Sequence, residues 1–206
     1  MALIIDIETI GKNFDKLNEV TRRSLTRWIR REAGGDEQKH NAYLQNVKEG
    51  LGLSPLTGEI AAIGVFDTRR NKGVVYFQSL DIETAEHNEA SFLFKPRTEK
   101  EMLLNFWEGI KKYNTIVTFN GQAFDLPFIM IRSAVNKIKP SINLMLKRYL
   151  NYQRKEIKHI DLFDQLSNYG AVRRMGSLHL YCEAFGIKSP KAAGISGEDV
   201  NSFFKQ

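Results

Sequence analysis

The sequence predicts an α/β protein that contains a mixed five-stranded sheet with helices on both of its faces. Three observations support this fold class. Short apolar stretches of strand length alternate with segments of helical periodicity along the 206 residues. A polar turn joins two neighbouring strands early in the chain, which predicts antiparallel pairing. The later strands are separated by helices, which predicts parallel strands joined by right-handed crossovers.

The first quarter of the chain is expected to form one strand and a helical segment. Residues 2–6 are mostly apolar and form the first strand. Apolar residues then recur at helical spacing over residues 13–32, and Gly34-Gly35 ends this helix. A second helical stretch covers residues 36–49. Two helices between the first strand and the next one indicate an insertion.

The composition fits one soluble domain. With 42% hydrophobic and 26% charged residues, a chain of this length can bury a substantial core. We expect a single domain over residues 1–206, with the helical insertion at about residues 12–50. No apolar run approaches the roughly 18 residues that span a membrane, and the N-terminus lacks the basic region of a signal peptide. The single cysteine, Cys182, fits a reducing compartment, so we expect a cytoplasmic protein without membrane contact.

The middle of the chain predicts two strands and a helix. Residues 59–67 and 73–80 are apolar, and the polar turn at 69–72 joins them. Thr98 and Glu101 have the spacing of a capping box, so a helix should begin there. Its apolar residues are spaced to face the core: Met102, Leu103, Phe106, Trp107 and Ile110.

The last third predicts the remaining strands and helices. Residues 116–119 are a short apolar strand, and a helix follows over 124–135 with Pro127 tolerated in its first turn. The last strand covers 157–160. Two helices, around 162–169 and 177–185, complete the chain. A ribonuclease H-like sheet has this order of elements, although other α/β folds share it.

A basic segment gives the chain its positive charge. The net charge is +6, and residues 132–174 hold ten basic side chains against three acids. Tyr149, Tyr152 and Tyr169 lie among these charges. Cationic and aromatic side chains together suit a phosphate backbone with stackable bases. A solvated face that keeps the protein soluble explains the same pattern.

The sequence places two carboxylates close together near the first strand. Asp6 and Glu8 are two residues apart, so on a strand they point to the same side. Two like charges repel each other unless a cation lies between them. A Lys or Arg partner is one answer, and a divalent cation is the other. Carboxylate oxygens suit Mg²⁺ or Mn²⁺.

A third carboxylate, Asp125, follows the strand that ends in Thr118-Phe119. Ligands gather at the carboxyl ends of parallel strands in such a sheet. Asp125 is therefore expected to join Asp6 and Glu8 if the two strands are neighbours. It also stands where a helix N-cap residue would stand, and it could serve both purposes.

The stretches LIIDIET and FNGQAFDLPFI, taken together, resemble the first two exonuclease motifs of the DEDD superfamily of 3′→5′ exonucleases. The sequence pattern Asn-Gly-x-x-Phe-Asp-Leu-Pro resembles a motif in the exonuclease domain of family B DNA polymerases. It resembles even more the predicted stand-alone exonucleases related to that domain. The stretches LSPLTGEIAAIGV, HIDLFDQLS and GISGEDV extend this resemblance over most of the chain outside the insertion.

The resemblance implies a ribonuclease H-like fold and a site with two divalent metal ions, Mg²⁺ or Mn²⁺. Asp6 would bridge the two metals, Glu8 would bind one, and Asp125 would hold the second directly or through water. Asn120 and Phe124 would contact the terminal nucleotide, and Thr9 would approach the 3′ end through its backbone. The implied activity is hydrolysis at 3′ ends of single-stranded DNA, or less favourably of RNA.

The superfamily has a fourth acid, the Asp of a Tyr-x-x-x-Asp or His-x-x-x-Asp motif. No Asp in this chain has Tyr or His four residues before it. Asp161 follows a strand and opens a helix, so we interpret it as a helix cap. We expect that the chain stops before the last helix of the fold; a natural variant without the motif is the alternative. Catalysis should then be impaired, and a non-catalytic nucleic-acid-binding module, or a purely structural domain, competes with the nuclease hypothesis.

Overall fold

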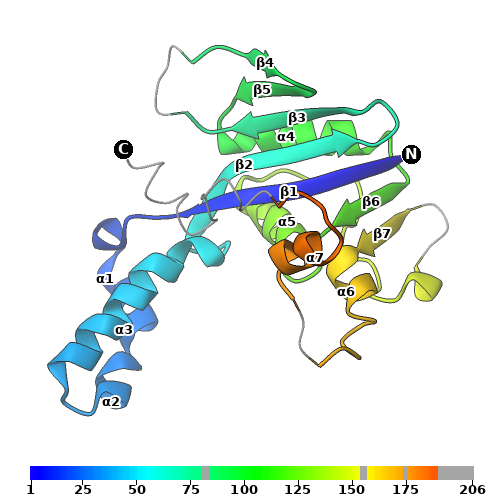
Figure 1. Cartoon of the computed structure of the whole chain (residues 1–206). Coiled ribbons are helices and arrows are strands. Elements are labelled where there is room, and N and C mark those ends of the chain that lie inside the picture. Colours follow the sequence, from blue (N-terminus) through cyan, green and yellow to red (C-terminus); the bar gives the residue numbers. More distant parts are fainter. Residues whose placement is uncertain (80–83, 154–156, 174–175, 190–206) are drawn as a thin grey trace.

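The computed structural model describes residues 1–79, 84–153, 157–173 and 176–189, and these contain a seven-stranded mixed sheet. The order across the sheet is β4-β5-β3-β2-β1-β6-β7 (Figure 1). The strands are β1 (Ala2–Gly11), β2 (Gly58–Asp67), β3 (Lys72–Phe77), β4 (His87–Glu89), β5 (Phe92–Pro96), β6 (Thr115–Thr118) and β7 (Lys158–Asp161). The α/β class and the mixed sheet are therefore confirmed.

The five expected strands are present, but the expected number was too small. β4 and β5 extend the sheet beyond β3, where β5 pairs parallel to β3 and β4 pairs antiparallel to β5. β4 consists of three polar, exposed residues, so it has no apolar periodicity to detect. β5 has only three consecutive apolar residues, and its pairing with β3 is set by the tertiary structure.

β1 lies between β2 and β6 in the sheet. It pairs antiparallel with β2 along nearly its whole length, and parallel with β6 only over Ala2–Ile4. The register between β1 and β2 shifts between Glu8 and Thr9, which is a β-bulge. Beyond Ile4, the β6-facing edge of β1 therefore has no strand partner in the described sheet.

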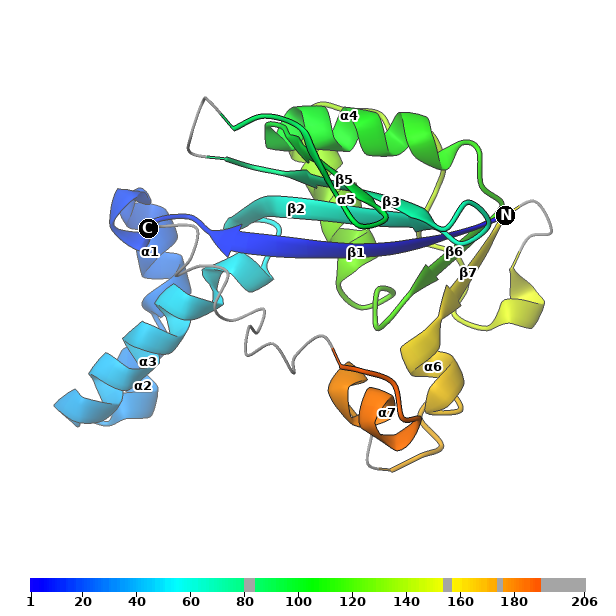
Figure 2. The same ribbon diagram turned by 45° about the horizontal axis from the view of Figure 1, so that its top comes forward.

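The helices of the described residues are α1 (Glu19–Thr26), α2 (Ile29–Ala33), α3 (Glu37–Glu49), α4 (Glu99–Ile110), α5 (Asp125–Val135), α6 (Leu162–Leu166) and α7 (Leu178–Ala184). α4 and α5 lie behind the sheet in Figure 1 and above it in Figure 2, whereas α7 lies on the opposite side. Leu3, Ile5 and Ile7 face the α4–α5 side and are buried in the main core. None of the described helices has the length and apolar character needed to cross a membrane.

The expected helix at 13–32 is interrupted, because two asparagines start separate helical turns. The Asn13 side chain accepts a hydrogen bond from the Asp15 N–H, and the Asn18 side chain accepts one from the Thr21 N–H. Such side-chain bonds favour helix starts over a continuous helix. A short 3₁₀ turn (Phe14–Lys16) and then α1 and α2 result.

The helices α1–α3 form a hairpin that projects from the end of β1 (Figure 1). Its base is close-packed against the sheet. A Cβ added at Gly11 would lie 2.9 Å from the Leu51 Cβ, so a larger residue would force the two segments apart. The Thr57 hydroxyl donates to the Leu51 carbonyl at 2.8 Å, and the Lys12 N–H donates to the Thr57 carbonyl at 3.0 Å.

A buried ion pair fixes α4 and α5 to the sheet. The Arg132 Nε and Nη2 donate to the Glu99 carboxylate at 2.8 and 2.7 Å, and the Ile60 N–H donates to it at 2.8 Å. Burial would raise the pKa of Glu99, but the bonds from Arg132, Ile60 and Asn136 outweigh burial and lower it. Three elements, α4, α5 and β2, thus meet at one ionised carboxylate.

We predict that Arg132→Leu lowers the free energy of unfolding by about 3–5 kcal/mol, because it leaves Glu99 charged, buried and unpaired. As a control, Arg23→Leu breaks the exposed pair with Glu19 and should cost less than about 1 kcal/mol. Urea unfolding followed by circular dichroism measures both. Equal effects for the two variants would show that the buried pair does not hold the layers together.

Candidate active site

Asp6 and Glu8 lie on the face of β1 opposite the main core. Leu3, Ile5 and Ile7 alternate with them and are buried, whereas Asp6 is exposed and Glu8 is half-buried. The expected strand stopped at Asp6, but β1 continues to Gly11. The two acids are therefore within the strand. What ends beside them is the pairing of β1 with β6, not the strand itself.

Asp125 reaches the same part of β1 from α5. It is 4% exposed, and its Oδ1 accepts a hydrogen bond from the Ile7 N–H at 3.0 Å. This N–H is available because β6 pairs with β1 only as far as Ile4. Phe124, not Asp125, is the N-cap residue of α5 and makes no side-chain capping bond. The capping interpretation of Asp125 is therefore wrong: its carboxylate points toward the strand between Asp6 and Glu8.

Burial raises the pKa values of all three carboxylates. Burial, and to a smaller extent the charge of Asp6, raise the pKa of Asp125 to about 7, although the hydrogen bond from the Ile7 N–H lowers it. The pKa of Glu8 is raised by burial and then by the charge of Asp6. Although Asp6 is exposed, partial loss of water around its carboxyl raises its pKa too. None of the three forms an ion pair with another described residue.

The three carboxylates are suitable ligands for a divalent cation, but they are not placed closely enough around one point to hold it. Carboxylate oxygens are the ligands that Mg²⁺ and Mn²⁺ prefer, and mutual repulsion of the acids would be relieved by such an ion. Over the described ranges, however, no three His, Cys, Asp or Glu side chains stand close enough to hold a metal ion as they are placed. The carboxylates would have to converge further around an ion.

Asp161 organises the loop that carries Asp125. Its carboxylate accepts hydrogen bonds from the Asn120 N–H at 2.7 Å, the Gln122 N–H at 2.9 Å and the Phe163 N–H at 3.0 Å. The last bond caps α6, so the expected capping role is confirmed. The other two bonds join β7 to the β6–α5 loop. These three bonds show that Asp161 orients backbone rather than offering a free ligand.

The tight turn of this loop requires its Asn-Gly sequence. Asn120 has a φ of +63°, a left-handed conformation that asparagine tolerates better than most residues. A Cβ added at Gly121 would lie 2.5 Å from the Thr118 side chain, so only glycine fits. The turn thereby sets where Asp125 begins α5.

A buried histidine, which the sequence reasoning did not single out, supports the same loop. His159 is 2% exposed; its Nε2 lies 2.8 Å from the Thr118 Oγ1, and its Nδ1 lies 3.1 Å from the Gln122 Oε1. Burial lowers the pKa of His159, whereas the charges of Asp161 and Asp164 raise it by less. Its position in an apolar strand was visible in the sequence, but its partners were not.

The three predicted substrate contacts differ in how accessible they are. Thr9 follows the β-bulge and is buried. Asn120 is exposed, and its side chain makes no hydrogen bond with a described residue. Phe124 is half-buried, with its ring 5.5 Å from that of Phe128. Asn120 is thus the most accessible of the three.

Only part of the basic segment at residues 132–174 lies near the site loop. The far end of α5 lies about 15 Å along the helix from Asp125. Lys137 follows that end, so it does not flank the acids. The part around 146–153 does approach the site loop, since Gln122 Nε2 lies 3.4 Å from the Leu146 carbonyl oxygen. There the Tyr149 ring lies 4.7 Å from that of Tyr169. Arg154, Lys155 and Arg174 of this segment are outside the described residues.

Comparison with known proteins identifies the family. Residues 57–206 match a family described as a predicted 3′-5′ exonuclease related to the exonuclease domain of PolB. The chain belongs to this family. The matched range excludes the α1–α3 hairpin, and it includes the stretch GISGEDV, which is outside the described residues.

Among solved structures, the chain resembles the family B DNA polymerase from the hyperthermophilic archaeon Pyrobaculum calidifontis. The TM-score is 0.55 and the sequence identity is 14% over 100% of this chain, which covers 21% of the polymerase. This likeness shows the ribonuclease H-like fold. No curated protein matches the chain.

The pKa of Asp125 predicts an unusual pH dependence. Between the unfolded value of 3.8 and the folded value of about 7, the folded chain holds a proton that the unfolded chain has released. The free energy of unfolding therefore decreases as the pH rises through this window. We predict that Asp125→Asn, which retains an acceptor for the Ile7 N–H, is more stable than the unchanged protein by about 1–3 kcal/mol at about pH 8 without divalent cations.

At about pH 3, where Asp125 is largely protonated in both the folded and the unfolded chain, this gain should vanish. Urea unfolding in the presence of a chelator measures it, with Glu108→Gln, an exposed acid on α4, as the control. Destabilisation by Asp125→Asn at both pH values would contradict the origin assigned to the pKa shift.

Proposed function

We propose that this chain is a metal-dependent 3′→5′ exonuclease that acts on the 3′ ends of single-stranded DNA, with RNA as a less favoured substrate. Family membership supports the exonuclease class. The observation that carries the proposal is the convergence of Asp6, Glu8 and Asp125 on one stretch of β1 without a protein cation among the described residues. Such an arrangement costs stability, so it is expected where an external cation supplies the missing charge.

Asp6, Glu8 and Asp125 would supply the carboxylate ligands for two divalent ions, Mg²⁺ or Mn²⁺. When bound, the ions would supply Lewis acidity toward the scissile phosphate and favour ionisation of the attacking water. The chain itself would orient the substrate. The exposed Asn120 side chain and the Phe124 ring would contact the terminal nucleotide, and the Thr9 backbone would approach the 3′ end.

Rigid backbone elements support this positioning. Asp125 is held by the Ile7 N–H, and the loop bearing Asn120 is held by Asp161. Placing a reacting group by such fixed bonds lowers the entropy lost in the transition state. The two bonds tie the substrate-contacting loop to β1 and β7.

A second candidate is a nucleic-acid-binding module that does not cleave. It is favoured by one observation: none of the Asp residues in the 206-residue sequence has Tyr or His four positions before it. Loss of an acid and of a water-orienting group would act mainly on the transition state. Turnover would then decrease more than affinity for the strand.

We predict that the protein shortens a 5′-labelled single strand from its 3′ end in the presence of Mn²⁺. Asp6→Asn should lower the rate at least about 100-fold, because about 3 kcal/mol of transition-state stabilisation would be lost. The same change should weaken Mn²⁺ binding measured by calorimetry, whereas Glu108→Gln should alter neither quantity. Strand binding without any shortening would favour the second candidate, and shortening unaffected by Asp6→Asn would refute the assigned site.

The exposed tyrosines and lysine near the site should bind the strand in different ways. Tyr152 is 69% exposed, and the Lys147 Nζ lies 5.8 Å from its ring centroid. Tyr152→Ala should weaken binding of a single strand by about 1–3 kcal/mol through lost stacking, without changing its salt dependence. Lys147→Ala should instead reduce the slope of log affinity against log salt by about 0.7.

Fluorescence anisotropy of a labelled strand at several salt concentrations separates these two effects. Lys111→Ala, on the exposed end of α4, serves as the control for loss of a distant positive charge. If affinity for the strand were independent of salt, this surface would not bind phosphates.

A further inference from the structure

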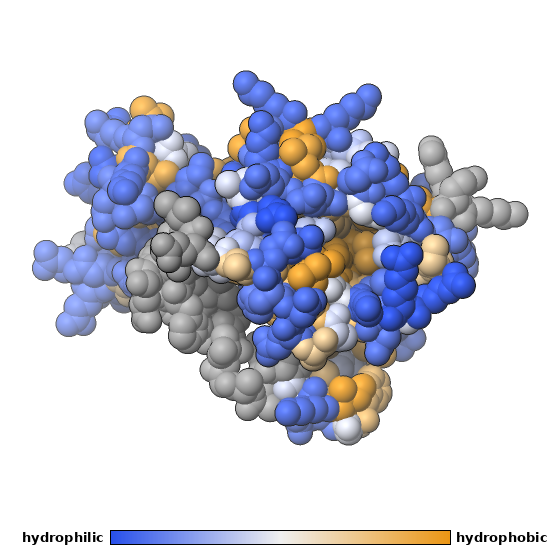
Figure 3. Space-filling view, turned by 90° about the horizontal axis from the view of Figure 1, so that it is seen from above, coloured by the Kyte–Doolittle hydropathy of each residue, from blue (hydrophilic) through white to orange (hydrophobic). Residues whose placement is uncertain are grey.

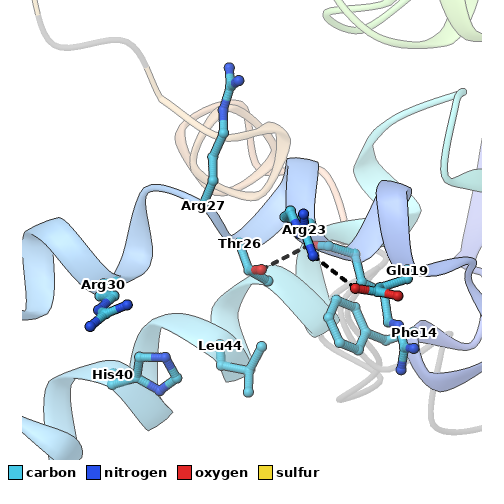
Figure 4. A pocket seen from close by; sticks show the side chains of 9 residues that line it. Phe14, Glu19, Arg23, Thr26, Arg27, Arg30, His40 and Leu44 are labelled. Carbon is cyan, nitrogen blue, oxygen red and sulfur yellow. Dashed lines mark hydrogen bonds and ion pairs between the residues drawn. The ribbon is translucent and has the colours of Figure 1, made fainter.

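The α1–α3 hairpin contains a pocket in which four of the nine lining residues are arginines (Figure 4). Its volume is about 460 Å³, which is within the usual range for small-ligand sites. The side chains that matter for its chemistry are Arg22, Arg23, Arg27, Arg30, Phe14 and Leu44. The hairpin is outside the residues that match the exonuclease family, so family membership assigns it no role.

The positive charge of the pocket is largely uncompensated. One carboxylate, that of Glu19, is in its lining, and it binds Arg23 at 2.8 Å. Arg22, Arg27 and Arg30 make no ion pair within the described part of the chain. The four arginines and Glu19 leave an excess of three positive charges, which favours an anionic ligand.

Packing does not explain these arginines. Within α1, α2 and α3, only Ile29 and Ala33 are buried. Arg27 and Arg30 are exposed, and hydrophilic side chains cover most of the hairpin, at the left of Figure 3. The cations are thus displayed on the surface rather than used to hold the helices together.

The lining combines two kinds of contact that a nucleic-acid strand needs. Guanidinium groups bind phosphate oxygens in a bidentate manner. In Figure 4, Leu44 lies between His40 and Phe14, so an apolar and aromatic surface adjoins the arginines. A base can pack on such a surface while its phosphate contacts a guanidinium.

The hairpin that carries the pocket is joined directly to the strand that carries Asp6 and Glu8. The hairpin begins where β1 ends, and Gly11 is three residues past Glu8, which corresponds to about 10 Å along the strand. The close contact of Gly11 with Leu51 fixes the hairpin base at this point. A strand of several nucleotides that starts at the acids can therefore extend to the hairpin, since a stacked strand rises about 3.4 Å per nucleotide.

We propose that the arginine pocket of the α1–α3 hairpin binds the phosphodiester backbone of the single strand whose 3′ end lies at Asp6, Glu8 and Asp125. The assignment of that 3′ end rests on the proposed function, whereas the pocket's affinity for the strand does not. The pocket contacts nucleotides upstream of the end. Long strands therefore bind more tightly than short ones.

The test measures binding of labelled single strands of about 5 and about 20 nucleotides by fluorescence anisotropy, with a chelator present to prevent hydrolysis. Arg22→Glu/Arg30→Glu should lower affinity for the long strand at least tenfold. It should leave affinity for the short strand within about twofold. The slope of log affinity against log salt for the long strand should fall by about 1.4, because two phosphate contacts are removed.

The matched control is Arg31→Glu/Lys39→Glu. It makes the same charge change on the same hairpin, at two exposed residues that do not line the pocket. The control should change the logarithm of long-strand affinity by less than half as much as Arg22→Glu/Arg30→Glu does. Circular dichroism of all variants confirms that the hairpin stays helical.

Three results would overturn the proposal. The first is equal loss of long-strand affinity in both double variants, which would indicate only nonspecific attraction. The second is unchanged affinity in the pocket variant. The third is full competition by a free nucleoside monophosphate or by an acidic peptide at concentrations comparable with the strand, which would identify a different occupant.

Failure of the proposed nuclease activity is distinguishable from these results. A protein that binds long strands through the pocket, but never shortens them in Mn²⁺, refutes hydrolysis and supports the pocket assignment. A protein that shortens strands at a rate and affinity unaffected by Arg22→Glu/Arg30→Glu refutes the pocket assignment and supports hydrolysis.

Discussion

The hydrogen bond between the Ile7 N–H and Asp125 is the interaction on which the arrangement of the site depends. It exists because β6 stops pairing with β1 after Ile4 and leaves the edge of β1 open. A side chain from α5 then takes the place of a neighbouring strand. The bond brings a carboxylate from 118 residues away in the sequence beside Asp6 and Glu8. The early end of the pairing between β1 and β6 thus accounts for the local excess of negative charge.

Two buried carboxylates on adjacent helices show how differently the same group can be used. Glu99 is surrounded by donors from Arg132, Ile60 and Asn136, so it is ionised and supports the packing of three elements. Asp125 has an N–H donor from β1 but faces other acids, so its pKa is raised to about 7. The first arrangement is typical of a structural pair, and the second of a functional site.

The sequence predicted those features that depend on local patterns. The capping box of Thr98 and Glu101 located the start of α4, and the period of a strand placed Asp6 and Glu8 on one face. The position of Asp125 relative to β1 could not be derived, since it depends on where a distant pairing stops. β4 and β5 were missed because they are short and lack periodicity. The role of Asp161 as a helix cap was predicted, whereas its bonds to Asn120 and Gln122 required the tertiary structure.

The insertion of the hairpin between β1 and β2 has a consequence for how the chain folds. These strands pair from Gly11 and Gly58 outward, so their association must close a long connection. The entropy of closure grows only with the logarithm of loop length, about 0.6 kcal/mol per doubling. A connection roughly eight times longer than a tight turn therefore costs only about 2 kcal/mol more. Because α1 and α3 form from local contacts, they shorten the chain that must be closed, and the sheet can accept such an appendage with little loss of folding speed.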